Sequence, residues 1–299
     1  MSFELTQETF SFISSPVIFL FICLEIYLSI KKSKHLYSVG ETLTNIYLTG
    51  VTILFNLLTA GFYLFVFDWA YQFHFIEIEN RFWYWFLLVI IQDFLYYWLH
   101  YVDHYSRFFW AIHVTHHNST EFNLTTGFRS SVFQPFYRFV YYLPLSFLGF
   151  KAVDIVLIYS ITQIWGIFVH TQLIHKFPKW FEFIFVTPSH HRVHHGSNVA
   201  YLDKNMGMFL IIWDRLFGTF QEEMDTDPVT YGLTTNPTER GPIAIIFHEF
   251  KAMFHDVRTR RTRFANKLKY IFFPPGWSHD GSTLTSEQLR EKLNSGAKK

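Results

Sequence analysis

Histidine is concentrated in one stretch of this chain and recurs there at spacings that suit metal binding. Eleven of the sixteen histidines lie between His100 and His195. They include one H-x3-H pair and two H-x2-H-H motifs, formed by His100, His104, His113, His116, His117, His191, His194 and His195. Residues three or four apart share a helical face, where two or three imidazoles can grip one ion. Eight such donors exceed the needs of a single ion, so the pattern predicts a two-metal site.

The donors available for this site are nitrogen atoms. Cys23 is the only cysteine, which excludes disulfides, zinc ribbons and iron–sulfur clusters within one chain. Neutral imidazole suits iron, zinc, copper or nickel. His170 is a ninth candidate donor. Iron is favoured because it activates O2, although the spacing alone leaves zinc open.

Further polar residues are expected to support the ligands. Asp93 lies seven residues before His100, on the same helical face, and a carboxylate inside an apolar segment needs a partner. The second nitrogen of a ligand imidazole would be one partner, and a salt bridge or hydrogen bond within the bundle would be another. Asp103 and Asp203 are weaker candidates for the same role. The remaining supporting candidates are Asn123, His175, which is either a ligand or an interfacial residue, and His190, which faces away from His191.

The composition indicates a multi-pass membrane protein. Half of the 299 residues are hydrophobic, 21% are aromatic and 16% are charged, with a mean hydropathy of +0.13. The formal charge of +1 gives no reason to expect a nucleic-acid partner. About five apolar segments approach the ~20 residues that cross a bilayer: 10–30, 44–68, 82–104, 132–150 and 152–175. Pro135, Arg138 and Pro144 interrupt the fourth segment, which is expected to be tilted or partial.

These segments predict an all-α bundle of about four or five membrane segments, with a helical cap that carries a dimetal site. We expect one domain over 1–299, with N-terminal spans in 1–80, the histidine motifs in 82–220 and a C-terminal cap in 221–299. Within that cap, 243–272 is expected to be a surface helix with a basic side, packed on lipid headgroups or on protein. Its expected role is structural.

Basic residues predict the orientation. Lys31, Lys32 and Lys34 follow the first segment, which places that loop in the cytoplasm. The third segment then ends at His100 and His104 on the same side. All candidate ligands are therefore expected on the cytoplasmic face of either a bacterial inner membrane or the endoplasmic reticulum.

From about Asp93 to Phe220, the chain resembles the fatty acid hydroxylase and sterol desaturase superfamily of membrane di-iron enzymes. The similar motifs, in order, are HYVDH, HVTHHNSTEFNLTTGFRSS, FVHTQLIH, TPSHHRVHHGSN and DKNMGMFLIIWDRLFGTF. The regions around 123–129 and 187–205 most resemble the alkylglycerol monooxygenase branch. The resemblance implies two Fe²⁺ ions held by the eight motif histidines, with His170 in the intervening position.

One position departs from that branch. The branch has an acidic residue after the second histidine of the first motif, where this chain has Tyr105. That branch uses tetrahydrobiopterin. Because Tyr105 departs from its pattern, the external electron donor could be a pterin, a cytochrome or a ferredoxin.

The expected function is O2-dependent monooxygenation of a long-chain membrane lipid, including cleavage of alkylglycerol ether lipids. One alternative within the same superfamily is a sterol or carotenoid hydroxylase or desaturase. From other classes, the alternatives are a membrane metal-binding or transport protein and a catalytically inactive homologue. Transport predicts ligands along a path through the spans, whereas these ligands gather at one face.

Overall fold

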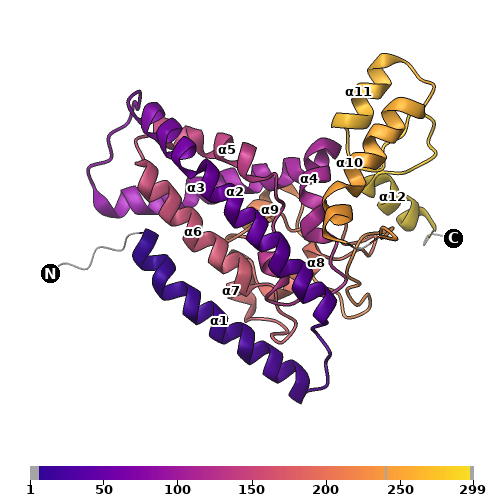
Figure 1. The fold of residues 1–299 in the computed structure, drawn as a ribbon, viewed down its shortest axis with the longest axis horizontal. Coiled ribbons are helices and arrows are strands. Elements are labelled where there is room, and N and C mark those ends of the chain that lie inside the picture. Colours follow the sequence, from indigo (N-terminus) through magenta and orange to yellow (C-terminus); the bar gives the residue numbers. More distant parts are fainter. Residues whose placement is uncertain (1–6, 240, 297–299) are drawn as a thin grey trace.

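The computed structural model describes residues 7–239 and 241–296, and the regular elements of this part are helices joined by loops (Figure 1). Within these ranges, β-structure is limited to two isolated bridges, Phe185 with Leu210 and Gly196 with Tyr231. The predicted all-α class is therefore confirmed for the described residues.

Three long helices are apolar enough to cross a membrane: α1 Gln7–Lys31, α2 Val39–Tyr71 and α3 Arg81–Tyr105. Side-chain caps start two of them, since Ser38 accepts from the backbone N–H of Glu41 and Asn80 accepts from that of Trp83. Only 11% of the most apolar window of α2 is buried inside the protein. Apolar side chains that face outward in this way are stable in contact with lipid. They therefore support the assignment of the chain as an integral membrane protein.

The fourth and fifth apolar segments form shorter helices than the sequence suggests. The helix α5, Pro135–Phe147, has 13 residues with Pro144 inside it, and α6, Ala152–Phe168, has 17. At 1.5 Å per residue they reach roughly 20 and 25 Å, against a hydrocarbon core of about 30 Å. Among the described residues, three helices therefore meet the length for a span, where four or five segments were expected. Leu88, Leu145 and Ile155 join α3, α5 and α6 in one buried core.

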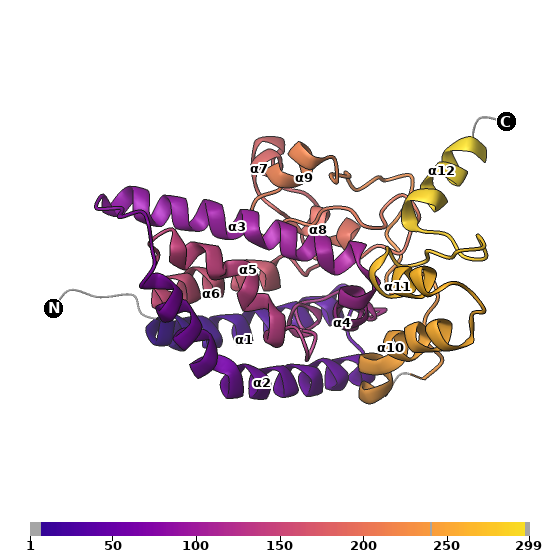
Figure 2. The same ribbon diagram turned by 90° about the horizontal axis from the view of Figure 1, so that it is seen from above.

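Two short helices that carry five of the eight motif histidines lie near the C-terminal end of α3 (Figure 2). They are α4 Arg107–His117 and α8 Pro188–His194, and the nearby connections contain η1 Thr126–Phe128, α7 Lys179–Ile184 and α9 Ile212–Phe217. Gly218 closes α9 in the left-handed conformation, with φ of 77°.

The C-terminal region forms α10 Pro242–Thr259, α11 Phe264–Phe272 and α12 Ser286–Gly296, which lie beyond α4 at the end opposite to the N-terminus (Figure 1). The single helix expected over 243–272 was wrong, because the chain breaks at 260–263. The break turns α11 back alongside α10, so that Met253 and Tyr270 are both buried.

Candidate metal centre

Nine histidines converge into two adjoining groups of side chains. The first group contains five rings: His100, His104, His113, His117 and His194. The second group contains four rings: His116, His170, His191 and His195. Within each group, the ring nitrogens that could bind an ion all lie within 4.8 Å of one another. These are the eight motif histidines together with His170, arranged as two sets.

Helical geometry explains how each H-x2-H-H motif contributes histidines to both groups. Residues four apart share a face, so His113 and His117 of α4 both enter the first group. His116 is one position away from His117, about 100° around the helix, and enters the second group. In α8 the assignment is reversed, because His194 joins the first group while His191 and His195 join the second. Each H-x2-H-H motif therefore bridges the two groups.

Hydrogen bonds determine which nitrogens face the second group. Nδ1 of His116 donates to the Arg129 carbonyl at 2.9 Å, and Nδ1 of His170 donates to the Gly166 carbonyl at 2.6 Å. A neutral ring with its proton on Nδ1 has a lone pair on Nε2. The two Nε2 atoms face each other at 3.4 Å. Two opposed lone pairs repel, and a cation bound by both removes that repulsion.

The remaining contacts of His170 exceed what hydrogen bonding can satisfy. Its Nε2 also lies 3.1 Å from Nε2 of His195 and 2.9 Å from Nε2 of His191. One lone pair cannot accept from several donors well, whereas several nitrogens can share one ion. Two nitrogens, each ~2.1 Å from a metal and at right angles, lie about 3.0 Å apart. The observed distances fit that arrangement.

The first group has the same character. His113 Nε2 lies 3.0 Å from His100 Nε2 and 3.2 Å from His117 Nε2. Nε2 of His104 and Nε2 of His194 are buried and have no hydrogen-bond partner among the described residues. Buried polar nitrogens without partners are costly, and a shared metal ion would satisfy them.

Burial also keeps the four rings of the second group neutral, because it lowers their pKa values. Desolvation lowers the pKa of His116 to about 4. For His191 and His195, desolvation and then the neighbouring histidines hold the pKa well below its ordinary value. Neutral imidazole is the form that binds a metal, so the second group is ready to do so at pH 7.

Among the three aspartates considered from sequence, Asp203 is the one that contacts a clustered ring. Its Oδ1 accepts from Nδ1 of His104 at 3.0 Å. Asp103 lies 3.8 Å from Nδ1 of His113, which is too long for a hydrogen bond, and it accepts from Gln134 and Tyr137 instead.

The expectation that Asp93 orients a ligand imidazole was wrong. Its carboxylate accepts from the backbone N–H groups of Phe209 and Leu210 and from the indole of Trp213, each at 3.0 Å. The alternative, a hydrogen bond within the bundle, describes Asp93 correctly. Its buried carboxylate links the loop before α9 to α3.

The other supporting candidates lie outside the two groups. His175 is exposed, and its carbonyl accepts a hydrogen bond from Arg192. His190 is buried against Phe220 and belongs to neither group. Asn123 supports the loop before η1, donating to the Leu36 carbonyl and accepting from Thr125.

Sequence reasoning missed the buried polar contacts that connect the early helices to this centre. Arg129 is fully buried and donates to Glu41 of α2 at 2.7 Å and to the Thr115 carbonyl of α4 at 2.8 Å. Glu25 of α1 accepts from Thr171, the neighbour of His170. An acidic residue within an apolar segment was the available signal for Glu25.

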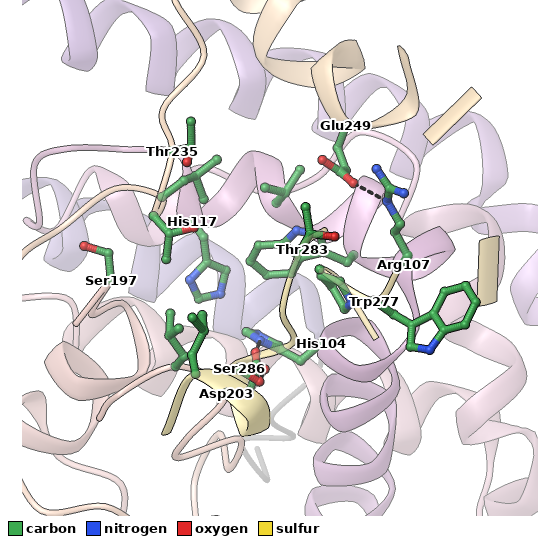
Figure 3. Close-up of a pocket in the computed structure, with 18 of the residues that line it drawn as sticks. His104, Arg107, His117, Ser197, Asp203, Thr235, Glu249, Trp277, Thr283 and Ser286 are labelled. Carbon is green, nitrogen blue, oxygen red and sulfur yellow. Dashed lines mark hydrogen bonds and ion pairs between the residues drawn. The ribbon is translucent and has the colours of Figure 1, made fainter. Parts of the chain in front are cut away.

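A pocket of about 390 Å³ opens onto the histidines (Figure 3). His104, His117, His194 and His195 form its floor, and Trp110, Tyr270 and Trp277 supply aromatic walls. At its rim, Arg107 pairs with Glu249 at 2.7 Å and with Asp256 at 2.8 Å. The C-terminal region therefore forms part of the chamber beside the histidines, a position that the purely structural role expected for it did not anticipate.

Tyr105, the residue at the departing position, ends α3 away from this floor. Its ring stacks on Tyr101, with centroids 4.1 Å apart and planes within 8°. It also borders a separate surface pocket that includes Arg290.

Comparison with known proteins agrees with these features. Residues 85–219 match the family model described as Fatty acid hydroxylase. Human alkylglycerol monooxygenase is 37% identical over 210 residues, which cover 70% of this chain and 46% of that protein. The alkylglycerol monooxygenase of Xenopus tropicalis is 38% identical over 195 residues, which cover 65% of this chain and 43% of that protein. That of Danio rerio is 37% identical over 220 residues, which cover 72% of this chain and 47% of that protein.

The chain spans about half the length of these curated relatives. No solved structure matches it. The matched region begins within α3, ends just after α9 and includes all nine clustered histidines. Residues 85–219 of this chain therefore belong to the fatty acid hydroxylase family.

Proposed function

We propose that this chain is a di-iron, O2-dependent membrane monooxygenase that hydroxylates a long-chain lipid. The observation that carries the proposal is the convergence of nine imidazoles, in which the Nε2 atoms of His116 and His170 lie 3.4 Å apart. The five rings of the first group would hold one ion and the four rings of the second group the other. Imidazole donors suit iron, and iron can activate O2.

When bound, the iron pair supplies the redox chemistry that places one atom of O2 into a C–H bond, while two electrons and two protons from an external donor convert the other atom to water. The chain's own residues orient the histidine rings and enclose the chamber beside them. Nδ1–H bonds to carbonyls fix the rings of His116 and His170 with Nε2 inward. Trp110 and Tyr270 line the chamber and limit water, which protects a reactive centre from side reactions.

The substrate class follows from the surroundings and the relatives. The outward apolar faces of α1 and α2 support a membrane location, and the similar proteins named above are alkylglycerol monooxygenases. An alkylglycerol ether lipid is therefore the first substrate to test. Hydroxylation at its ether-bearing carbon would give a product that collapses to an aldehyde and an alcohol.

We propose an external electron donor and a cytoplasmic active site. Tetrahydrobiopterin is one candidate donor, with a cytochrome or a ferredoxin as the others, because Tyr105 departs from the pterin-using branch. Lys31, Lys32 and Lys34 support a cytoplasmic active site. We propose that residues 1–299 form one domain.

The test is turnover of purified, iron-loaded protein with ¹⁸O2. An alkylglycerol, a free long-chain fatty acid and a sterol would each be supplied with each donor class. One ¹⁸O atom in a product of the alkylglycerol or fatty acid, lost in His194→Ala, is the expected result. A product from the sterol alone would instead assign the sterol hydroxylase alternative. No oxygenated product from protein with a full metal complement would refute the monooxygenase.

A further inference from the structure

One four-residue segment, Asp203–Met206, holds the outer nitrogens of three of the five first-group rings. These rings come from α3 and α8, and their inner nitrogens face the cluster. The contacts are Asp203 Oδ1 with His104 Nδ1 at 3.0 Å, the Lys204 carbonyl with His194 Nδ1 at 2.9 Å, and the Met206 carbonyl with His100 Nδ1 at 2.7 Å. The position of this segment therefore determines how most of the first group is aimed.

The segment has a backbone that requires support from outside. Asp203 has φ of 52° and Asn205 has φ of 56°, both in the left-handed region. Aspartate and asparagine tolerate that region better than most residues, but it remains sparsely populated. Such a conformation persists where surrounding contacts hold it.

At the Met206 end of the segment, side chains of α9 and of the segment itself hold the backbone in place. The carboxylate of Asp214 accepts from the backbone N–H groups of Met206 at 2.6 Å and Gly207 at 2.8 Å. The side chain of Asn205 donates to the His190 carbonyl at 3.0 Å. These contacts fix the end of the segment at Met206.

The C-terminal helix supports the other end. Ser286, the first residue of α12, donates its hydroxyl to Oδ2 of Asp203, whose Oδ1 accepts from His104. Arg290, one turn later, donates to the Leu202 carbonyl at 2.6 Å. Figure 3 shows Ser286, Asp203 and His104 together on one wall of the pocket. The two contacts join residues more than eighty positions apart in the chain.

We propose that Ser286 and Arg290 are positioning residues for the first-group histidines, acting through Asp203 and Leu202. Each carboxylate oxygen of Asp203 has its own donor, so the hydroxyl of Ser286 limits rotation of the group that aims His104. The C-terminal helix thereby sets how tightly the first group holds its ion. This inference rests on the proposed function, which supplies the ions.

The test measures metal release rather than activity. The full-length protein is loaded with Fe²⁺ without oxygen, and the loss of Fe²⁺ to an excess of chelator is followed by absorbance. The His191→Ala variant identifies the release phase of the first group. In Ser286→Ala, that phase is expected to be about fivefold faster, the effect of losing one hydrogen bond, while the second-group phase is unchanged.

Matched variants separate positioning from general damage. Ser286→Thr keeps the hydroxyl and is expected to restore the slow first-group phase. Ser295→Ala makes the same substitution on the same helix, at an exposed hydroxyl that bonds only to the Lys292 carbonyl, and is expected to match the parent protein. Arg290→Met removes the second contact of α12, the hydrogen bond to the Leu202 carbonyl. Iron release from the first group should also be faster in this variant.

The outcomes for this inference and for the proposed function are distinct. Unchanged release in both Ser286→Ala and Arg290→Met would overturn the positioning role, and so would equal acceleration of both phases. A parent protein that never retains two ions would instead overturn the two-metal proposal itself.

Discussion

Replacing Gly127 with alanine should disturb the second group of histidines through one added carbon atom. A Cβ at this position would lie 3.1 Å from Nδ1 and 3.2 Å from Cγ of His170, and 3.0 Å from Cα of Ile167. Ordinary contacts between carbon atoms are about 3.5–4.0 Å. The helix backbone at Ile167 cannot yield easily, so the imidazole must move by a few tenths of an ångström.

That ring has little freedom to move. Its Nδ1 is bonded to the Gly166 carbonyl at 2.6 Å, and Phe122 stacks near it with centroids 5.3 Å apart. His170 Nε2 also has close contacts with three other imidazoles, at 2.9 to 3.4 Å. Misplacing it therefore affects all four donors of the group. Changes around metal ligands typically cost ~10–100-fold in affinity, and we expect Gly127→Ala to weaken the second-group ion by at least about tenfold.

The assay is Fe²⁺ release to a chelator, with Gly61→Ala as the matched control. A Cβ at Gly61 would meet nothing within 4 Å, so this variant should keep both ions as the parent does. Gly127→Ala should lose the second-group ion faster and keep the first-group ion. If it retains both ions at the parent rate, the claim that His170 is a closely held ligand is refuted.

Three further predictions address the ligands and their supports. His191→Ala removes one of four second-group donors and should lower the iron content from two ions to one per chain by elemental analysis; two retained ions would contradict its role. Arg129→Met removes the buried cation that contacts Glu41 and should destabilise the protein by about 3–5 kcal/mol, seen as a lower thermal midpoint in detergent, and an unchanged midpoint would count against that contact. Asp93→Leu leaves the N–H groups of Phe209 and Leu210 without their acceptor, at ~1–3 kcal/mol each, and should speed proteolysis near α9, whereas Asp93→Asn should resist cleavage better.

Helical spacing made the centre predictable. Positions three or four apart lie near one helical face, so the motif histidines were expected to converge on metal ions. The structure separates His113 from His116 and His191 from His194, so spacing alone did not say which ion each histidine serves. The count of donors also predicted two sets, and the structure brings His170 into the second set. The three long apolar segments became α1, α2 and α3 with boundaries within about five residues of those expected.

The supports of the ligands were not predictable in the same way. His100, His116, His170 and His194 are oriented by backbone carbonyls, which every residue carries and which leave no pattern in the sequence. The real partners of Asp93 are backbone groups more than a hundred residues away, so periodicity within α3 could not reveal them.

The C-terminal region shows a similar limit. Its basic and apolar pattern predicted a surface helix, and that pattern is compatible with one helix or with two that fold back on each other. The approach of Ser286 to Asp203 depends on how α12 packs, which is a tertiary property.

The most direct test of this account is the iron content of the purified chain, measured together with its protein concentration after anaerobic loading with Fe²⁺ and removal of loosely bound metal. Two histidine groups predict two iron ions per chain. A ratio of one, or a protein that retains no iron while correctly folded, would contradict the dimetal centre.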